Sequence, residues 1–288
     1  MKKIILVLLV IGAGYFFFGT KEGKIMKNVA ISYATSPNLI NREGVTVAER
    51  IKLPKDFRRK SYPEGSFQQY IQNYTLQPFG AKVVNYDGQD YAYQAGHVGV
   101  FTLPVPDNGL QQCADALIRL RAEYLWEQNR KDEIGFNFTS GHYCSWARYA
   151  EGFRPKINGN RVSFARTAAA DASRANFYRY LNLIFMYSGT QSLYDELPEV
   201  GSISEVEVGD MLINPGSPGH VIMVADVAMD DNGRKLLIFA QGNTPAQSVH
   251  LLKNPNDLGL NPWYEVEIGQ YLEIPTYYFN EVKFVRFK

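Results

Sequence analysis

The chain has 288 residues, of which 45% are hydrophobic, and this is enough for one large domain or two small ones. The 30 Lys and Arg residues nearly balance the 29 Asp and Glu residues, and there is no long run of like charges. This balance argues against a nucleic-acid-binding protein, which needs a basic excess or patch. Two cysteines are too few for a disulfide-dense scaffold.

The first 20 residues predict a targeting segment. Two lysines precede an apolar run over residues 4–18, and the chain becomes polar again from Gly19. The run is short for a membrane span and long for a signal-peptide core, so a cleaved signal peptide and an uncleaved membrane anchor both remain open. We favour the anchor, because no Ala-x-Ala cleavage pattern is present. Either reading exports the rest of the chain, so we expect a periplasmic or inner-membrane-anchored protein that contacts the membrane through this segment.

Residues 21–40 indicate a linker, and residues 41–288 indicate a single α+β domain with an antiparallel sheet packed against helices. Apolar residues at three- and four-residue spacing predict helices over 67–74, 110–125 and 168–187, with Gly189 ending the last one. Alternating or continuous apolar runs predict strands over 40–53, 81–86, 91–101, 134–138, 204–213, 219–228, 235–241 and 248–252, and a last hairpin over 274–287.

A histidine stands at the mouth of one predicted strand. Asp231-Asn232-Gly233 is a tight-hairpin signal between residues 219–228 and 235–241. A turn centred between Asp231 and Asn232 pairs His220 with Asn243, and a turn centred one residue later pairs Ile222 with Asn243. Side chains alternate along a strand, so both registers place His220, Gln241 and Asn243 on one face. A side-chain amide beside a histidine holds the ring of a catalytic base in position, as in Cys-His-Asn sites.

The nucleophile for such a base is less well defined. Cys113 lies near the start of the helix predicted over 110–125, where the helix N-terminus favours a thiolate, and the preceding Gln112 offers an amide donor for an oxyanion. Cys113 also lies on the apolar stripe of this helix, so ordinary core packing is an alternative. Cys144 as the nucleophile and a Cys113–Cys144 disulfide are two further alternatives.

The other polar residues carry less functional signal. His97 suits a core or rim position, His142 a surface loop and His250 a solvent-facing strand position, while Asp210 suits a solvated strand end. The four dispersed histidines lack metal-ligand spacing, and no phosphate-binding glycine motif occurs, so we expect neither a metal nor a cofactor. Gln112, Trp146 and Gly219 are candidate substrate-binding residues.

Several motifs together resemble a bacterial domain-of-unknown-function family, number 4846. They are residues 108–123, 136–141 and 185–190, Gly209-Asp210, Pro218-Gly219-His220 and residues 240–247. The resemblance covers roughly residues 40–270 and implies an exported or anchored envelope protein of no established activity.

A weaker resemblance, over residues 206–243, links the chain to the papain-like NlpC/P60 and CHAP cell-wall hydrolases and implies a papain-like half-barrel core. Those families carry their nucleophile on the helix before the Gly-Asp strand, and here the helix predicted over 168–187 has no cysteine.

Two functions follow as expectations. The first is an envelope hydrolase of amide bonds, with peptidoglycan peptides as the candidate substrate, in which Cys113 attacks, His220 moves the proton, and Gln241 or Asn243 holds the ring. The second is a non-catalytic domain that binds an envelope polymer or peptide in the same cleft. Neither function involves nucleic acid.

Overall fold

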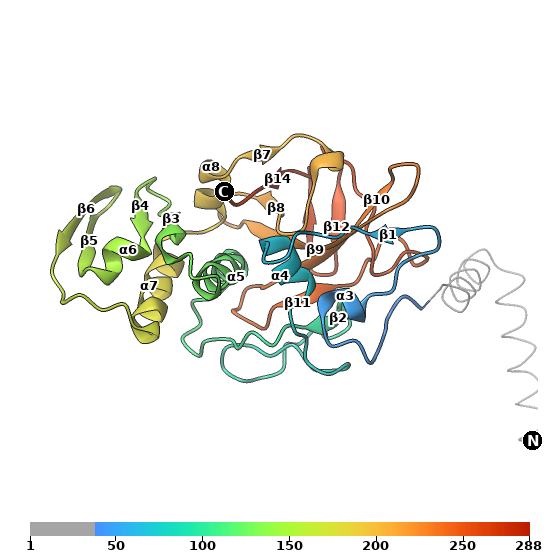
Figure 1. Ribbon diagram of the computed structural model, residues 1–288, viewed down its shortest axis with the longest axis horizontal. Coiled ribbons are helices and arrows are strands. Elements are labelled where there is room, and N and C mark those ends of the chain that lie inside the picture. Colours follow the sequence, from blue (N-terminus) through green and yellow to red (C-terminus); the bar gives the residue numbers. More distant parts are fainter. Residues whose placement is uncertain (1–37) are drawn as a thin grey trace, which may run out of the picture.

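The computed structural model describes residues 38–288 (Figure 1). The targeting segment predicted over residues 1–20, and nearly all of the predicted linker, lie outside the described residues. Within residues 38–288, no helix combines the length and the apolar character that a membrane crossing requires.

An eight-stranded antiparallel sheet forms the main body. Its strands follow the order β2-β11-β10-β9-β8-β14-β7. The eighth strand, β1, pairs with the last two residues of β9. Their bounds are β1 Arg58–Arg59, β2 His97–Val100, β7 Glu199–Val200, β8 Met211–Asn214, β9 His220–Met229, β10 Lys235–Gln241, β11 His250–Leu252 and β14 Phe284–Val285. Nearly every residue of β9 and all of β10 are buried, so both faces of the sheet are covered here. The sheet is open and does not close on itself.

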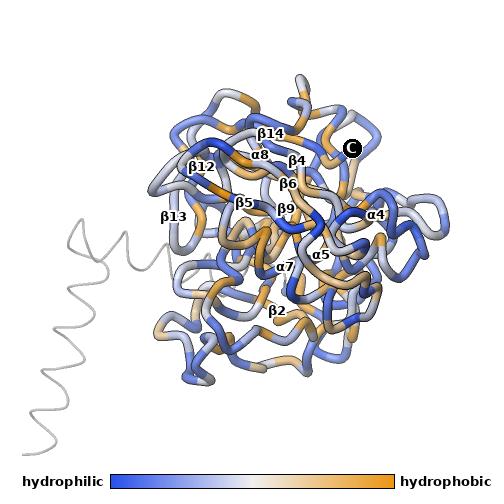
Figure 2. The backbone as a smooth tube through the Cα atoms, turned by 90° about the vertical axis from the view of Figure 1, so that its left-hand side faces the viewer, coloured by the Kyte–Doolittle hydropathy of each residue, from blue (hydrophilic) through white to orange (hydrophobic). Residues whose placement is uncertain are grey.

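Three helices pack against the sheet at its central strand β9. Helices α3 (Val47–Arg50), α4 (Phe67–Gln72) and α5 (Cys113–Glu127) all contact β9. Helix α5 is the longest of the helices within residues 38–288, and twelve of its fifteen residues are buried because it lies between the sheet and a second group of elements (Figure 1). Hydrophobic segments gather towards the middle of the molecule, and hydrophilic ones are frequent on the outer loops (Figure 2).

The second group of elements lies on the other side of α5 (Figure 1). It contains β3 (Gly135–Asn137), β4 (Tyr143–Ser145), α6 (Trp146–Ala150), β5 (Phe153–Asn158), β6 (Arg161–Arg166) and α7 (Arg174–Tyr187). Helix α8 (Thr190–Glu196) then leads back to β8. The short helices η1 (Lys131–Glu133) and η2 (Ile203–Glu205) and the hairpin of β12 (Leu272–Ile274) and β13 (Tyr277–Phe279) complete the fold.

Of the element predictions that differ from the structure, three have an identifiable local reason. Residues 40–53 hold the short helix α3, because Thr46 and Glu49 form a capping box. Residues 81–96 form no strand, only two isolated bridges, Val84 with Asp90 and Asn85 with Gln247. The side chain of Gln94 accepts from the N–H of Val83 (3.0 Å) and donates to its C=O (2.8 Å), and so occupies hydrogen-bonding groups that a longer ladder would use. Helix α7 starts six residues later than predicted, where Ser173 accepts from the N–H of Asn176.

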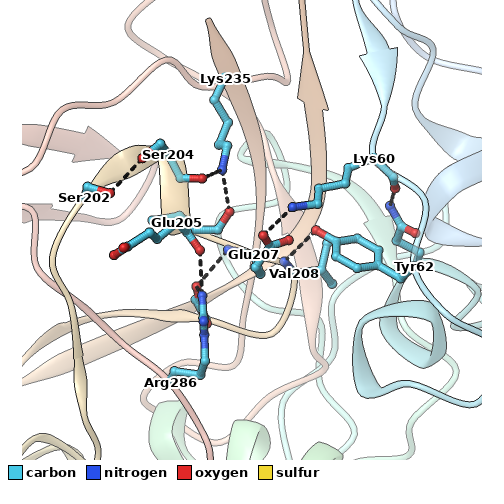
Figure 3. A network of polar contacts seen from close by, with 12 residues as sticks. Lys60, Tyr62, Ser202, Ser204, Glu205, Glu207, Val208, Lys235 and Arg286 are labelled. Carbon is cyan, nitrogen blue, oxygen red and sulfur yellow. Dashed lines mark hydrogen bonds and ion pairs between the residues drawn. The ribbon is translucent and has the colours of Figure 1, made fainter. Parts of the chain in front are cut away.

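A polar network links residues around the second half of β9, where Lys235 pairs with Met229 and the N–H of Lys60 donates to the carbonyl of Val227 (Figure 3). The ammonium of Lys235 donates to the carbonyls of Ser204 (2.6 Å) and Val206 (2.8 Å), and Lys60 forms an ion pair with Glu207. Arg286 donates to both carboxylate oxygens of Asp210, at 2.6 and 2.8 Å. Asp210 is therefore buried and paired, and the expectation of a solvated strand end was wrong.

Candidate functional site

The start of α5 and the His220 end of β9 open onto one cavity of about 740 Å³. Loops before α5, after α7, before β9 and after β10 complete its walls. Its lining residues are Gly109, Leu110, Gln112, Cys113, Ala114, Asp115, Phe185, Met186, Ser188, Gly189, Thr190, Gly216, Ser217, Pro218, Gly219, His220, Asn243, Thr244 and Tyr277. The predicted nucleophile and the predicted base thus share one cavity, although they lie far apart in the sequence.

The β9–β10 hairpin reaches its register in two steps. Near the turn, Lys235 pairs with Met229, which centres the turn on Asn232, between the two predicted registers. A β-bulge between Ile238 and Phe239 then shifts the pairing by one residue, so that Ala240 pairs with Met223. Continued to the strand end, this register places His220 opposite Asn243, as the first predicted register does.

His220 is held by an amide of the neighbouring strand. Its Nε2 lies 2.8 Å from Oε1 of Gln241, and its ring packs 4.8 Å from that of Tyr277, centroid to centroid. An amide oxygen only accepts, so Nε2 carries the hydrogen and Nδ1 has a free lone pair. His220 is 3% exposed, and this burial lowers the pKa of its ring although the hydrogen bond to Gln241 raises it. The ring is therefore neutral at neutral pH.

Cys113 is the first residue of α5, and Gln112 is the N-cap. Its side chain is 8% exposed, and burial raises the pKa of the thiol to about 11. The backbone N–H groups of Ala114, Val221 and Cys113 itself act in the opposite direction, because they stabilise a thiolate. Val221 directly follows His220, so the sulfur lies against the strand that carries the base. Among the described residues, the thiol and the His220 ring form no direct hydrogen bond.

Two glycines shape the contact between α5 and the strands. A Cβ on Gly242 would lie 2.8 Å from Cβ of Ala116 and 3.1 Å from the carbonyl oxygen of Gln112. A Cβ on Gly219 would lie 2.4 Å from Oγ1 of Thr190 and 2.6 Å from the carbonyl oxygen of Gly216. Both glycines therefore permit close packing within the protein. Gly219 lines the cavity, but the need for glycine at this position is explained by the close neighbours within the protein.

Asp115 is a residue of the cavity that the sequence analysis missed. It is 6% exposed, and its Oδ2 accepts from the N–H of Gln112 at 3.0 Å, while Oδ1 has no hydrogen-bond partner. Burial raises the pKa of this carboxyl to about 7, and the N–H groups of Gln112 and Asp115 offset only part of that rise. Among the described lining residues Asp115 is the one carboxyl, and none is a Lys or Arg. The sequence signal that could have identified Asp115 is its position: it is an acidic residue at the third position of a helix whose N-cap, Gln112, is not one of the usual capping residues.

The remaining predicted site residues are Asn243, Gln112 and Trp146, and only the first two line the cavity. Asn243 lines the cavity and donates to Oγ1 of Thr276 (3.3 Å), so Gln241 rather than Asn243 contacts the His220 ring. Gln112 is exposed at the rim, and its Oε1 accepts from Oγ1 of Thr244 at 3.0 Å. The prediction for Trp146 was wrong, because this side chain is 3% exposed, packs against Trp126 and Phe177, and does not line the cavity.

The alternative predictions for cysteine and histidine also have clear outcomes. Cys113 and Cys144 are both free, so they form no disulfide, and Cys144 lies on β4 outside the cavity. His97 is half-buried on β2, as a rim residue would be. His250 was expected to face solvent, but it is 4% exposed, and its ring nitrogens lie against Gln241 and the carbonyl of Ser248 inside the protein. Within residues 38–288, no three His, Cys, Asp or Glu side chains gather as metal ligands would.

Comparison with known proteins places the chain in one family. Searches of curated proteins and of solved structures found no match. The family model described as domain of unknown function (4846) matches residues 47–286, which include α5, the β9–β10 hairpin and the whole cavity wall. The chain therefore belongs to the family of the domain of unknown function (4846).

Proposed function

We propose that this protein is a thiol-dependent hydrolase of amide bonds, with Cys113 as nucleophile and His220 as general base. The observation that carries the proposal is the convergence of three groups from separate parts of the chain. They are a helix-start thiol, an imidazole on the neighbouring strand and an amide that fixes this imidazole. A nucleophile, a base and a group that orients the base are the parts of a Cys-His-amide site.

The chemistry follows from the positions of these groups. Sulfur attacks the carbonyl carbon of an amide, and Nδ1 of His220 takes the thiol proton. The same nitrogen then gives that proton to the departing amine, and water hydrolyses the remaining thioester. The negative oxygen of the tetrahedral intermediate would meet the N–H of Cys113 at the helix start and the free NH₂ group of Gln112 at the rim.

We further propose that the substrate is a peptide of the cell envelope, such as a peptidoglycan stem peptide. The apolar segment over residues 4–18 supports export of the domain. The weaker resemblance of residues 206–243 to papain-like cell-wall hydrolases supports this substrate class and a papain-like arrangement of the core. A cavity of about 740 Å³ is large enough for several residues of a peptide.

The test is turnover of purified muropeptides by the full-length protein, followed by mass spectrometry. Cys113→Ala and His220→Ala should each abolish cleavage. Cys144→Ala is the matched control, because Cys144 is a similarly buried thiol outside the cavity, and this variant should cleave at the parent rate. Full cleavage by Cys113→Ala would exclude the proposal.

One observation favours a second function, a non-catalytic domain that binds an envelope polymer or peptide in the same cavity. The thiol and the imidazole are both largely buried, burial raises the thiol pKa, and the two groups form no direct hydrogen bond. A binding domain would retain muropeptides without cleaving them. In that case Cys113→Ala would bind muropeptides as tightly as the parent, and no product would form with either protein.

A further inference from the structure

A second buried histidine lies behind Gln241, on the far side from His220. Nε2 of His250 is 3.2 Å from Nε2 of Gln241, and Nδ1 of His250 is 2.8 Å from the carbonyl oxygen of Ser248. His250 is 4% exposed, and it does not line the cavity. A chain of four groups therefore runs from the cavity into the core, namely His220, Gln241, His250 and the Ser248 carbonyl.

The end of this chain fixes the direction of every hydrogen bond in it. A backbone carbonyl only accepts, so Nδ1 of His250 carries a hydrogen and donates to Ser248. In a neutral imidazole the other nitrogen is then an acceptor, and Nε2 of His250 requires a donor. Gln241 can supply that donor only from its NH₂ group. Its carbonyl oxygen must then face the other way, towards Nε2 of His220.

The opposite orientation of the amide is excluded by the same logic. A flipped Gln241 would place its oxygen against Nε2 of His250, and both nitrogens of His250 would then need hydrogens, which makes it a cation. Burial, together with the nearby rings of His97 and His220, lowers the pKa of His250 to about 4. The hydroxyl of Thr276, 3.2 Å from Nε2 of Gln241, does not choose between the orientations, because a hydroxyl both donates and accepts.

We propose that His250 is a positioning residue that sets the tautomer of His220 through the Gln241 amide and leaves Nδ1 of His220 free to accept a proton in the cavity. The role of this arrangement in catalysis rests on the proposed function, but the tautomer of His220 does not depend on that function. Without an acceptor at position 250, the Gln241 amide has no reason to prefer one orientation, and His220 becomes a mixture of both neutral tautomers.

The experiment is nitrogen NMR of the imidazoles in the full-length protein near pH 7.5, which distinguishes a ring nitrogen that carries hydrogen from one that does not. In the parent protein we expect opposite tautomers, with hydrogen on Nε2 of His220 and on Nδ1 of His250. This measurement needs no variant and no substrate. Hydrogen on Nδ1 of His220, or on Nε2 of His250, would overturn the proposal.

Three variants separate positioning from packing. His250→Leu removes the acceptor. In the parent, the Nε2–H tautomer of His220 should exceed the Nδ1–H tautomer at least about fivefold, which corresponds to the free energy of one net hydrogen bond. In His250→Leu this ratio should fall towards one. His250→Gln returns an acceptor oxygen near the place of Nε2 and should restore the parent ratio. Thr276→Val removes the other partner of the amide and should leave the ratio unchanged. A parent ratio in His250→Leu would refute the proposal.

The outcomes also separate this proposal from the proposed hydrolase. If the tautomers are as expected and His250→Leu mixes them, the positioning role holds even when no muropeptide is cleaved. If cleavage depends on Cys113 but His250→Leu keeps a single His220 tautomer, the hydrolase stands and the positioning role fails. If both hold, kcat should fall in His250→Leu and recover in His250→Gln, while KM changes little.

Discussion

Gly242 gives the sharpest mechanical test of how the site is assembled. It follows β10 directly and contacts the first turns of α5, where a Cβ would lie 2.8 Å from Cβ of Ala116. The best separation of two carbon atoms is about 3.5 to 4.0 Å, so Gly242→Ala is short of space by roughly 0.7 Å or more. The backbone of Gly242 does not adopt a positive φ, so the substitution adds a steric conflict without backbone strain.

The conflict must move α5, because the nearby atoms belong to the helix backbone and to a Cβ without rotamers. Overpacking of this kind destabilises a protein by about 1 to 3 kcal/mol. The same shift moves Cys113, whose Cα would lie 3.7 Å from the new Cβ. A displacement near 1 Å lowers a catalytic rate by up to about a hundredfold, so any muropeptide cleavage should fall more than the stability does.

A double-mutant cycle measured by urea unfolding tests this reasoning. Ala116→Gly alone should cost about 1 kcal/mol through helix propensity, but it removes the atom that Gly242→Ala meets. The double variant should therefore be more stable than the sum of the single changes predicts, by about 1 kcal/mol. Gly201→Ala is the control, because a Cβ added at Gly201 would meet no atom within 4 Å, and it should change stability little. Additive effects within about 0.5 kcal/mol would contradict the packing argument.

Three further predictions concern ionisable groups. Asp115→Asn should gain stability relative to the parent as the pH rises from about 4 to 7. The raised pKa makes the folded parent bind more protons than the unfolded chain in that range, so the parent loses at most about 4 kcal/mol of its free energy of unfolding. The measurement is urea unfolding at several pH values. A difference in stability between Asp115→Asn and the parent that stays constant with pH would contradict this reasoning. Alkylation of Cys113 in a Cys144→Ala background should accelerate about tenfold per pH unit from 7 to 9, and a plateau in that range would contradict the raised thiol pKa. Arg286→Met should destabilise the protein by about 3 kcal/mol by leaving Asp210 buried and unpaired, and adding Asp210→Asn should recover most of this; equal stability of single and double variants would contradict it.

Much of the central sheet was predictable because its signal is local. The apolar run of β9 is interrupted once, at Asp226, that of β10 is continuous from Leu236 to Ala240, and both strands lie within one residue of the predicted ranges. Side-chain alternation then places His220 and Gln241 on one face in either register. The β-bulge at Ile238 could not be predicted, since it depends on how the two strands twist against their neighbours and leaves no mark on the apolar pattern.

The burial of the site was not predictable from the sequence, because it depends on which elements cover each face. Val249 and Leu251 alternate with His250, a pattern that suits a strand with one wet face. Strand β11 has neighbours on both edges, and all three of its residues are buried, so both of its faces are dry. Asp115 was missed for a similar reason. It occupies the buried side of a helix whose other neighbours, Gly242 and several of the cavity loops, come from distant parts of the chain.

The burial of Cys113 and His220 would determine which thiol chemistry the proposed hydrolase performs. A thiolate–imidazolium pair needs a lowered thiol pKa and a raised imidazole pKa, and burial shifts both groups the other way. The pair is therefore neutral at rest, and a proton must leave the sulfur as the carbon–sulfur bond forms. That transfer would require a ring nitrogen of His220 that carries no hydrogen, and the hydrogen bond from Nε2 to Gln241 leaves Nδ1 as that nitrogen. In the proposed hydrolase, the orientation of the buried Gln241 amide would thus decide whether the neutral pair can react.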